Sequence, residues 1–129
     1  KVIAVLDWEL STLGDPLADF TYHLMSWQMP SSDPVRPSLA DVTDKEAKGI
    51  PTQDQYVARY CELTGRSGLP ELAYYFAYNA FRLAGILQGI VGRVRDGTAS
   101  NAAAAQNEAR VAPLAQFAYA CAQRAGMEG

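Results

Sequence analysis

The stretch Val2-Ile-Ala-Val-Leu-Asp-Trp-Glu9 opens the chain, and Leu10-Ser-Thr-Leu-Gly-Asp-Pro-Leu-Ala-Asp19 follows it. Residues 2–6 are all apolar, a pattern typical of a short strand that is buried on both faces. Asp7 stands where such a strand would end, and in α/β proteins ligands gather at the carboxyl ends of strands. Gly14-Asp15-Pro16 then supplies a turn, a helix N-cap and a first-turn proline. The sequence therefore predicts a strand, an exposed carboxylate, a loop and a capped helix in quick succession.

Taken alone, Asp7 is either a functional carboxylate or an ordinary loop acid that ends an edge strand. Ile3-Ala-Val-Leu-Asp-Trp-Glu9 with Gly14-Asp-Pro-Leu-Ala-Asp19 resembles the metal-binding segment of the aminoglycoside-phosphotransferase-like kinases, a superfamily that includes the choline kinases. The likeness is closest to the phosphotransferase domains related to those fused to acyl-CoA dehydrogenases. It continues into Phe81-Arg-Leu-Ala-Gly-Ile-Leu-Gln-Gly89 and Asp96-Gly-Thr-Ala-Ser100, so it covers essentially the whole chain. The combined motif indicates the superfamily and does not name a substrate.

The resemblance implies a mainly α chain, α+β overall, that forms the C-terminal helical portion of a protein-kinase-like C-lobe. One short N-terminal strand would precede about four helices, and residues 1–129 would form one C-terminal subdomain. Kinases of this superfamily also have an N-lobe with a phosphate-binding lysine and a His-Gly-Asp-x-x-x-x-Asn catalytic loop. The sequence contains no His-Gly-Asp, and its only histidine, His23, stands in a different context. We therefore expect the N-lobe and catalytic loop to be absent from this chain, and the chain alone to be inactive.

The resemblance also implies an activity for the intact enzyme. It would transfer the ATP γ-phosphoryl to a small-molecule hydroxyl, with an aminoglycoside-like or hydroxyacyl-CoA-like acceptor and with ATP and Mg²⁺ as cofactors. Asp7 would be a metal ligand, because Mg²⁺ prefers carboxylate oxygens. Since this chain lacks the catalytic loop, no catalytic residue is expected in it. The alternative is a non-catalytic helical binding module on a kinase-like fold.

Two further acids have open roles. In an extended segment Glu9 would point to the same side as Asp7, where it would assist the metal or bind a cationic acceptor. Otherwise Glu9 is a solvated loop acid. Asp19 resembles the acid that supports the catalytic loop from below; otherwise it belongs to a solvated polar face together with His23, one helical turn on. Asp15 is expected to be a helix cap and not a ligand.

Apolar periodicity predicts the first helix over residues 16–28, with one face formed by Leu17, Phe20, Leu24 and Trp27. Thr52-Gln-Asp-Gln55 reads as a capping box for a second helix that stops at Gly65. Residues 29–51 lie between these helices and are rich in proline and serine, which is typical of an irregular insert. Such a long connection is either a substrate-contacting loop or a spacer.

The third helix is predicted over residues 70–96 and the last over residues 100–124, with a kink or a division at Pro113. The third helix is apolar on both sides, which indicates a buried central helix. One stripe contains Leu72, Phe76, Asn79, Leu83, Ile86, Leu87, Ile90 and Val94, and the opposite side contains Tyr74, Tyr78, Phe81, Gly85, Gly89 and Gly92. The glycines would accept either a slim, alanine-rich neighbouring helix or an elongated acyl substrate. Arg82, Gly85, Gly89 and Arg93 therefore form a possible substrate groove, in which the arginines would meet an anion or be paired with acids.

Composition sets the remaining expectations. The 129 residues suit one domain, with 49% hydrophobic and 19% charged residues. A net charge of −3 argues against nucleic acid or an anionic membrane as a partner. Cys61 and Cys121 lack metal-ligand spacing and are expected to be buried free thiols, which favours the cytoplasm. The expected partners are the hydroxyl acceptor, the missing N-lobe and a second copy of the chain that binds through exposed apolar surface.

Overall fold

A computed structural model of the chain describes residues 2–31, 38–99 and 102–127. In these residues the long elements are α1 (Pro16–Leu24), α2 (Gln53–Thr64), α3 (Leu72–Arg95) and α4 (Glu108–Arg124). Short 3₁₀ helices lie between them: η1 (Trp8–Leu10), η2 (Met25–Trp27), η3 (Leu39–Asp41) and η4 (Ala102–Asn107). The prediction of a mainly α chain with about four helices is therefore confirmed.

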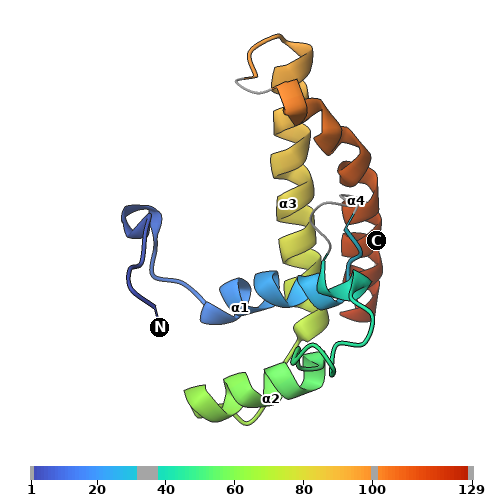
Figure 1. Cartoon of the computed structure of the whole chain (residues 1–129). Coiled ribbons are helices and arrows are strands. Elements are labelled where there is room, and N and C mark those ends of the chain that lie inside the picture. The colour runs from blue at the N-terminus through green and yellow to red at the C-terminus, as the bar shows by residue number, and fades with distance from the viewer. Residues whose placement is uncertain (1, 32–37, 100–101, 128–129) are drawn as a thin grey trace.

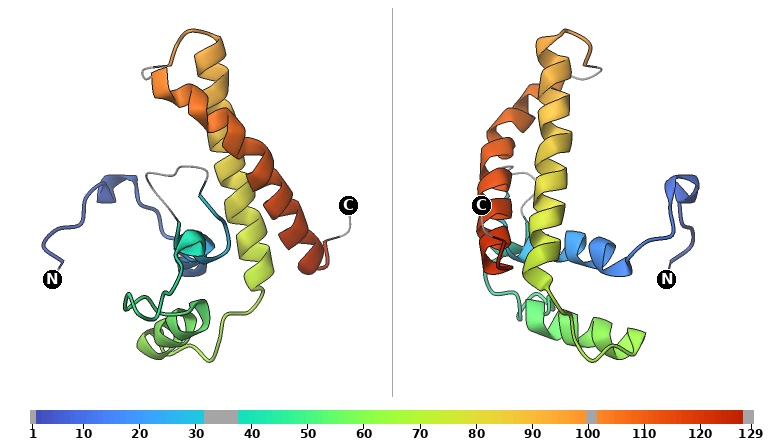
Figure 2. Two further views of the ribbon diagram at one scale, coloured as in Figure 1. Left: turned by 45° about the vertical axis from the view of Figure 1, so that its right-hand side comes forward. Right: turned by 180° about the vertical axis from the view of Figure 1, so that it is seen from behind.

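The two longest helices determine the shape of the molecule. Helices α3 and α4 run side by side in opposite directions, and α1 crosses α3 near its N-terminal end (Figure 1). Helix α2 lies beyond that end of α3, and both further views show the N-terminal segment projecting away from the helices (Figure 2). No helix in the described part of the chain is both long and apolar enough to cross a membrane.

The core lies where α1, α3 and α4 meet. Its buried residues are Leu24, Met25, Phe76, Ala77, Ala80, Ala84, Leu87, Leu114, Ala118 and Cys121. Several of these side chains are alanines on α3, and small side chains at a contact let two helices approach closely. Cys121 is buried, Cys61 is half-buried, and both thiols are free.

Helix α2 is attached to α1 mainly through aromatic rings. The Phe20 ring stacks on Tyr60 with 3.7 Å between centroids, and Tyr56 stacks on Trp27 at 4.9 Å. The Trp27 indole Nε1 also donates to the carbonyl of Pro51, at 3.1 Å, just before α2 begins. Stacked rings of this kind add stability beyond their buried area, so they hold α2 in place without a large apolar core.

The helix-end signals predicted at Asp15, Thr52 and Gly65 are present in the structure, whereas the first helix is α-helical only to Leu24 and continues to Trp27 as η2, not to residue 28. The Asp15 carboxylate accepts from the Leu17 backbone N–H at 2.9 Å. Thr52 and Gln55 form the reciprocal capping box, with the Thr52 N–H donating to Gln55 Oε1 at 2.9 Å and the Gln55 N–H donating to Thr52 Oγ1 at 3.2 Å. Gly65 ends α2 with φ of 69°, a left-handed conformation that favours glycine.

The last helix differs from the prediction at its start and in its middle. Its predicted first residues, 100 and 101, lie outside the described residues. Helix α4 runs without division across Pro113, and the change from 3₁₀ to α geometry falls earlier, between Asn107 and Glu108. A division at Pro113 is therefore wrong. Pro113 is the sixth residue of α4, so its missing N–H leaves the Ala109 carbonyl without its intrahelical donor, yet the helix continues through it.

The predicted N-terminal strand is wrong for this chain. Residues 2–7 form no strand and no ladder in the described structure, and Ile3 is 94% exposed. A strand needs a neighbouring backbone for its hydrogen bonds, and the described residues offer none. Residues 2–6 thus have the sequence pattern of a strand, but the described residues form no sheet with them.

The prediction that α3 is buried on both sides is also wrong. Phe81 on its second face is 74% exposed, and Tyr74 and Tyr78 beside it are exposed as well. A Cβ atom placed on Gly85 would meet nothing within 4 Å. Helix α4 packs instead on the alanine side of α3, so a neighbouring helix does not explain these glycines.

Hydrogen bonds to Asp41 hold together the described part of the insert. The Asp41 carboxylate accepts from the Ser31 N–H at 2.7 Å, from the Ser38 N–H at 2.9 Å and from the Ser38 hydroxyl at 3.0 Å. These donors, the Ser31 N–H first, hold the pKa of Asp41 below its usual range. Between residues 38 and 51 the only helical element is η3, and the remainder is turn and irregular backbone.

Candidate functional site

Residues 7–9, which we call the acidic segment, are exposed to solvent. Asp7 is exposed and takes up a left-handed conformation, with φ of 58° and ψ of 21°, at the N-terminal end of η1. Aspartate visits this region more readily than most residues, because its short polar side chain tolerates it. The Asp7 carboxylate makes no capping hydrogen bond and no ion pair within the described residues. Its oxygens are therefore free for a ligand.

Glu9 does not have the predicted relation to Asp7. It lies inside η1, so the alternation of an extended segment does not apply to it. Among the described residues, no group of three His, Cys, Asp or Glu side chains is placed to hold a metal ion. Proteins commonly hold Mg²⁺ through one or two carboxylates together with phosphate oxygens and water. Asp7, alone or with Glu9, fits such a partial set and needs further ligands from outside it.

Asp19 is exposed on α1, and no described residue pairs with it. Its side chain does not contribute to the packing of α1 on α3. The proposed contact with a catalytic loop requires residues that the structure does not contain, so that role stays a prediction.

A hydrogen-bonded junction between α1 and α3 lies just after this segment. The Asp15 carboxylate, which caps α1, also accepts from the Tyr75 hydroxyl on α3. This hydrogen bond from Tyr75 is the main reason that the pKa of Asp15 lies below its usual value, with the Leu17 N–H second. The same bond raises the pKa of the Tyr75 phenol, since it favours the protonated hydroxyl.

Asn79 forms the buried half of the same junction. Its side chain is fully buried, and Nδ2 donates to the Ala18 carbonyl and to Thr21 Oγ1, each at 2.9 Å. The Thr21 hydroxyl in turn donates to the Leu17 carbonyl at 2.5 Å. Asn79 Oδ1 is buried without a hydrogen-bond partner in the described structure. Sequence analysis placed Asn79 within an apolar stripe, and a lone amide there is the signal that could have revealed the junction.

The four residues of the predicted substrate groove are placed separately and do not enclose a cavity. Arg82 lies over the ring of Tyr22, with the guanidinium carbon 5.9 Å from the ring centroid. Gly85 and Gly89 are exposed, and Arg93 Nη1 lies 3.9 Å from the position of a Cβ on Gly89. The structure thus brings Arg93 to Gly89 and leaves Arg82 on the side of α1.

The main apolar groove of the molecule lies instead between α3 and α4. We call this space, of about 560 Å³, the aromatic groove. It is lined by Tyr74, Ala77, Tyr78, Phe81, Ala115, Ala118, Tyr119, Ala122 and Met127. Tyr74, Tyr78 and Phe81 belong to the face of α3 that was expected to be buried, so the sequence pattern identified these residues but not their exposure, whereas Tyr119 comes from α4.

Comparison with known proteins shows which family the chain resembles. Residues 1–75 match the model of the phosphotransferase enzyme family, a range that contains the acidic segment, α1 and the junction residue Tyr75. Acyl-CoA dehydrogenase family member 10 of Mus musculus is 40% identical over 126 residues, which is 98% of this chain and 12% of that protein.

Two further relatives also match most of this chain. Acyl-CoA dehydrogenase family member 11 of Homo sapiens is 37% identical over 94 residues, covering 72% of this chain and 12% of that protein. The probable acyl-CoA dehydrogenase IBR3 of Arabidopsis thaliana is 30% identical over 109 residues, covering 83% of this chain and 13% of that protein. The chain thus spans about an eighth of the length of these relatives, and no solved structure matches it significantly.

The family match covers more than half of the chain and includes every element that surrounds Asp7. It agrees with the resemblance carried by the Asp-Trp-Glu and Gly-Asp-Pro motifs. The chain therefore belongs to the phosphotransferase enzyme family.

Proposed function

We propose that this chain is the C-terminal part of an ATP-dependent phosphotransferase, in which Asp7 binds Mg²⁺ at the ATP phosphates. The observation that supports this most strongly is the exposed, unpaired carboxylate of Asp7 within a family motif. In the intact enzyme the bond between the γ-phosphorus and its bridging oxygen breaks, and a new bond forms to the acceptor hydroxyl. Such reactions depend on positioning and charge neutralisation more than on covalent catalysis. The base that receives the hydroxyl proton would lie outside these residues.

The remaining site residues have supporting roles in this proposal. Glu9 assists the metal or contacts the acceptor, and Asp19 holds the catalytic loop that precedes the segment in the intact protein. The exposed apolar residues 2–6 would pair as a strand with the missing N-terminal part, which is the first partner of this chain. The two free thiols favour a reducing compartment such as the cytoplasm.

The acceptor that we propose is the hydroxyl of an acyl thioester of coenzyme A, with an aminoglycoside-like acceptor as the second candidate. The relatives named above are described as acyl-CoA dehydrogenases, which supports the first choice. The net charge of −3 does not favour either acceptor.

A non-catalytic binding module is the alternative, and one observation favours it. The aromatic groove leaves Phe81 74% exposed and Tyr119 60% exposed, and exposed aromatic patches are common at protein interfaces. A second copy of the chain could cover this face. The two functions predict different behaviour, since a binding module does not need Asp7.

The experiment uses the protein extended upstream so that it includes the N-lobe, with ADP formation measured against hydroxyacyl-CoA and aminoglycoside acceptors. Asp7→Asn keeps the size of the side chain and should lower kcat by about 10²-fold or more, because it removes charge stabilisation at the phosphates. Asp44→Asn is the matched control: Asp44 is also exposed and also has a positive φ, of 52°, but lies in the insert.

The outcomes separate the two functions. Loss of turnover in Asp7→Asn with full turnover in Asp44→Asn supports the phosphotransferase. Unchanged turnover in Asp7→Asn contradicts the metal role. Absence of ADP formation from the extended protein with either acceptor favours the binding module. The 129-residue chain alone should bind Mg²⁺–ATP more weakly than millimolar, and tighter binding would show that it holds more of the site than we propose.

A further inference from the structure

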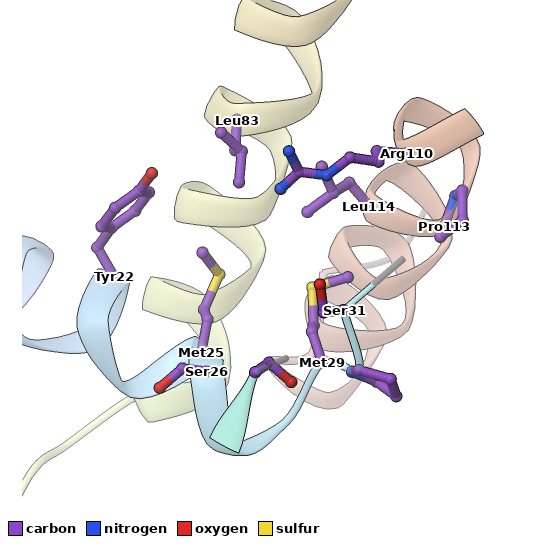
Figure 3. Close-up of a pocket in the computed structure, with 11 residues that line it drawn as sticks. Tyr22, Met25, Ser26, Met29, Ser31, Leu83, Arg110, Pro113 and Leu114 are labelled. Carbon is purple, nitrogen blue, oxygen red and sulfur yellow. The ribbon is translucent and has the colours of Figure 1, made fainter. Parts of the chain in front are cut away.

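A cavity of about 320 Å³ lies where the C-terminal end of α1 and the start of the insert face α3 and α4 (Figure 3). We call it the arginine pocket, because Arg110 of α4 lines it. Its volume falls within the range of small-molecule sites in proteins. Asp7 precedes the other end of α1, and nine helical residues span about 13 Å, so this pocket is separate from the acidic segment.

The pocket has an apolar floor. Met25 is 6% exposed and Leu114 is 4% exposed, and both line the cavity together with Met29 and Leu83. Figure 3 shows Met25 and Leu83 on one side of the space and Met29 and Leu114 on the other. Methionine is unbranched and adapts its shape to different apolar ligands. This floor suits an aliphatic group.

Arg110 places a positive charge above that floor. Its guanidinium points toward Leu83 across the pocket (Figure 3), and it forms no ion pair or hydrogen bond with any described residue. Glu108, the acid two residues before it, is already bound by Arg95 at 2.6 Å. No Asp or Glu is among the described residues that line the cavity. Among the described residues, the pocket therefore combines an apolar surface with a cation, Arg110, that pairs directly with no acid.

The walls of the arginine pocket bring further charged groups close to it. Tyr22 forms one side, and the Arg82 guanidinium lies over its ring at 5.9 Å, which brings a second positive charge close to the cavity. Ser31 and Ser38 line the rim, where both bind the Asp41 carboxylate. These hydrogen bonds lower the pKa of Asp41 and keep its carboxylate ionised, so one negative charge lies beside the rim, against the two positive charges of Arg110 and Arg82.

We propose that the arginine pocket binds a small amphipathic anion, an aliphatic carboxylate with a chain of about eight carbons. The carboxylate would pair with Arg110, and the chain would lie on Met25, Leu83 and Leu114. Guanidinium binds carboxylate through two parallel hydrogen bonds, which fixes the orientation of the ligand. The proposed site uses neither Asp7 nor Glu9.

The chain contains three methionines, and they give a direct readout. Met25 and Met29 line the arginine pocket, whereas Met127 lines the aromatic groove. In the protein labelled with ¹³C at the methionine methyls, octanoate should shift the Met25 and Met29 NMR signals and leave Met127 unchanged. Octanol tests the aliphatic chain without the charge, and inorganic phosphate tests the charge without the chain.

Arg110→Gln should weaken octanoate binding by about tenfold or more, because it removes a charge-assisted pair. Arg93→Gln removes the same charge from an exposed site outside the pocket and should bind octanoate like the wild type. Both positions are exposed, so circular dichroism should show an unchanged fold.

Four results would overturn the proposal. Equal shifts at Met127 would indicate general apolar partitioning, and equal binding of octanol would remove the role of Arg110. Unchanged affinity in Arg110→Gln would contradict the carboxylate contact. Absence of any shift at millimolar octanoate would show that the pocket does not bind this class of ligand.

Discussion

The segment before Gly14 and the junction after it differ in how this chain supports them. Residues 2–9 carry the motif that identifies the family, yet they are exposed, and no hydrogen bond, ion pair or ring contact joins them to α1–α4 in the described structure. A few residues on, Asp15 binds Tyr75, and Asn79 binds the backbone of α1 inside the core. The most informative part of the sequence is thus the least supported part of the fold.

The difference separates two kinds of sequence signal. The role that we propose for Asp7 needs further ligands, and the described residues place no group of metal ligands around it. The junction specifies how α1 docks on α3, and both partners are present. Substitutions in the two regions should therefore differ greatly in their effect on the stability of the isolated chain.

The largest effect is expected at Leu24. This side chain is fully buried between the helices, so Leu24→Ala should lower the free energy of unfolding by about 2–5 kcal/mol, the usual cost of a cavity in a core. Leu6→Ala is the matched control, since Leu6 is 81% exposed, and it should change stability by less than about 0.5 kcal/mol. Urea denaturation measures both. A large loss in Leu6→Ala would mean that the opening segment packs on the body after all.

The next effect is expected at Asn79. Asn79→Ala removes both hydrogen bonds from Nδ2 and leaves the Ala18 carbonyl without this donor, so it should cost about 1–3 kcal/mol. Gln88→Ala, at an exposed position on the same helix, should change stability by less than about 0.5 kcal/mol. Equal values for the two variants, again from urea denaturation, would mean that the buried amide does not stabilise the junction.

A substitution at Gly85 is expected to have a smaller effect and to raise the free energy of unfolding. Because a Cβ there meets no atom within 4 Å, Gly85→Ala should stabilise α3 by about 0.8–1 kcal/mol through helix propensity. Gly65→Ala should destabilise, because Gly65 has φ of 69°. Thermal unfolding of both variants tests whether the side of α3 that carries Gly85 is open to solvent. If Gly85→Ala destabilises the isolated chain, another surface must lie against that face.

The smallest effect is expected from pH. The Tyr75 hydroxyl and then the Leu17 N–H lower the pKa of Asp15 below its usual 3.8. A lowered folded-state pKa gives stability that is present above the unfolded value and is lost as the pH falls through the folded value. Below pH 3.8 the wild type should therefore lose stability more steeply than Asp15→Asn, which keeps a capping side chain. Tyr75→Phe removes the main cause of the lowered Asp15 pKa. It should therefore also make the free energy of unfolding depend less steeply on pH below 3.8, which urea denaturation at several pH values would measure.

Local signals in the sequence predicted most of the helices. Capping at Asp15 and Thr52 and the left-handed stop at Gly65 depend only on neighbours in sequence, and all three are present. No strand forms at residues 2–6 and Phe81 is exposed, so both of these predictions were wrong. A strand and a buried helix face each need a partner segment, which the local sequence does not identify. Periodicity showed two apolar faces on α3 but could not show which of them α4 covers.

The candidate site divides in the same way. The motif identified Asp7, but its metal ligation stays a prediction because the partner ligands are not in this chain. The junction of Asp15, Tyr75 and Asn79 was not predicted, since its members lie about 60 residues apart and pair only after α1 crosses α3. The same holds for Arg110, which reaches its pocket only when α4 has packed.

The stacking of Trp27 on Tyr56 has a consequence for spectroscopy. The chain has two tryptophans: Trp8 is 71% exposed in the acidic segment, and Trp27 lies in the aromatic stack between α1 and α2. Each indole therefore reports on one of the two regions by its emission wavelength and its access to a quencher. If the missing lobe docks on the opening segment, Trp8 should shift to shorter wavelength while Trp27 keeps its signal. Two intrinsic fluorophores thus distinguish completion of the site from changes in the helical body.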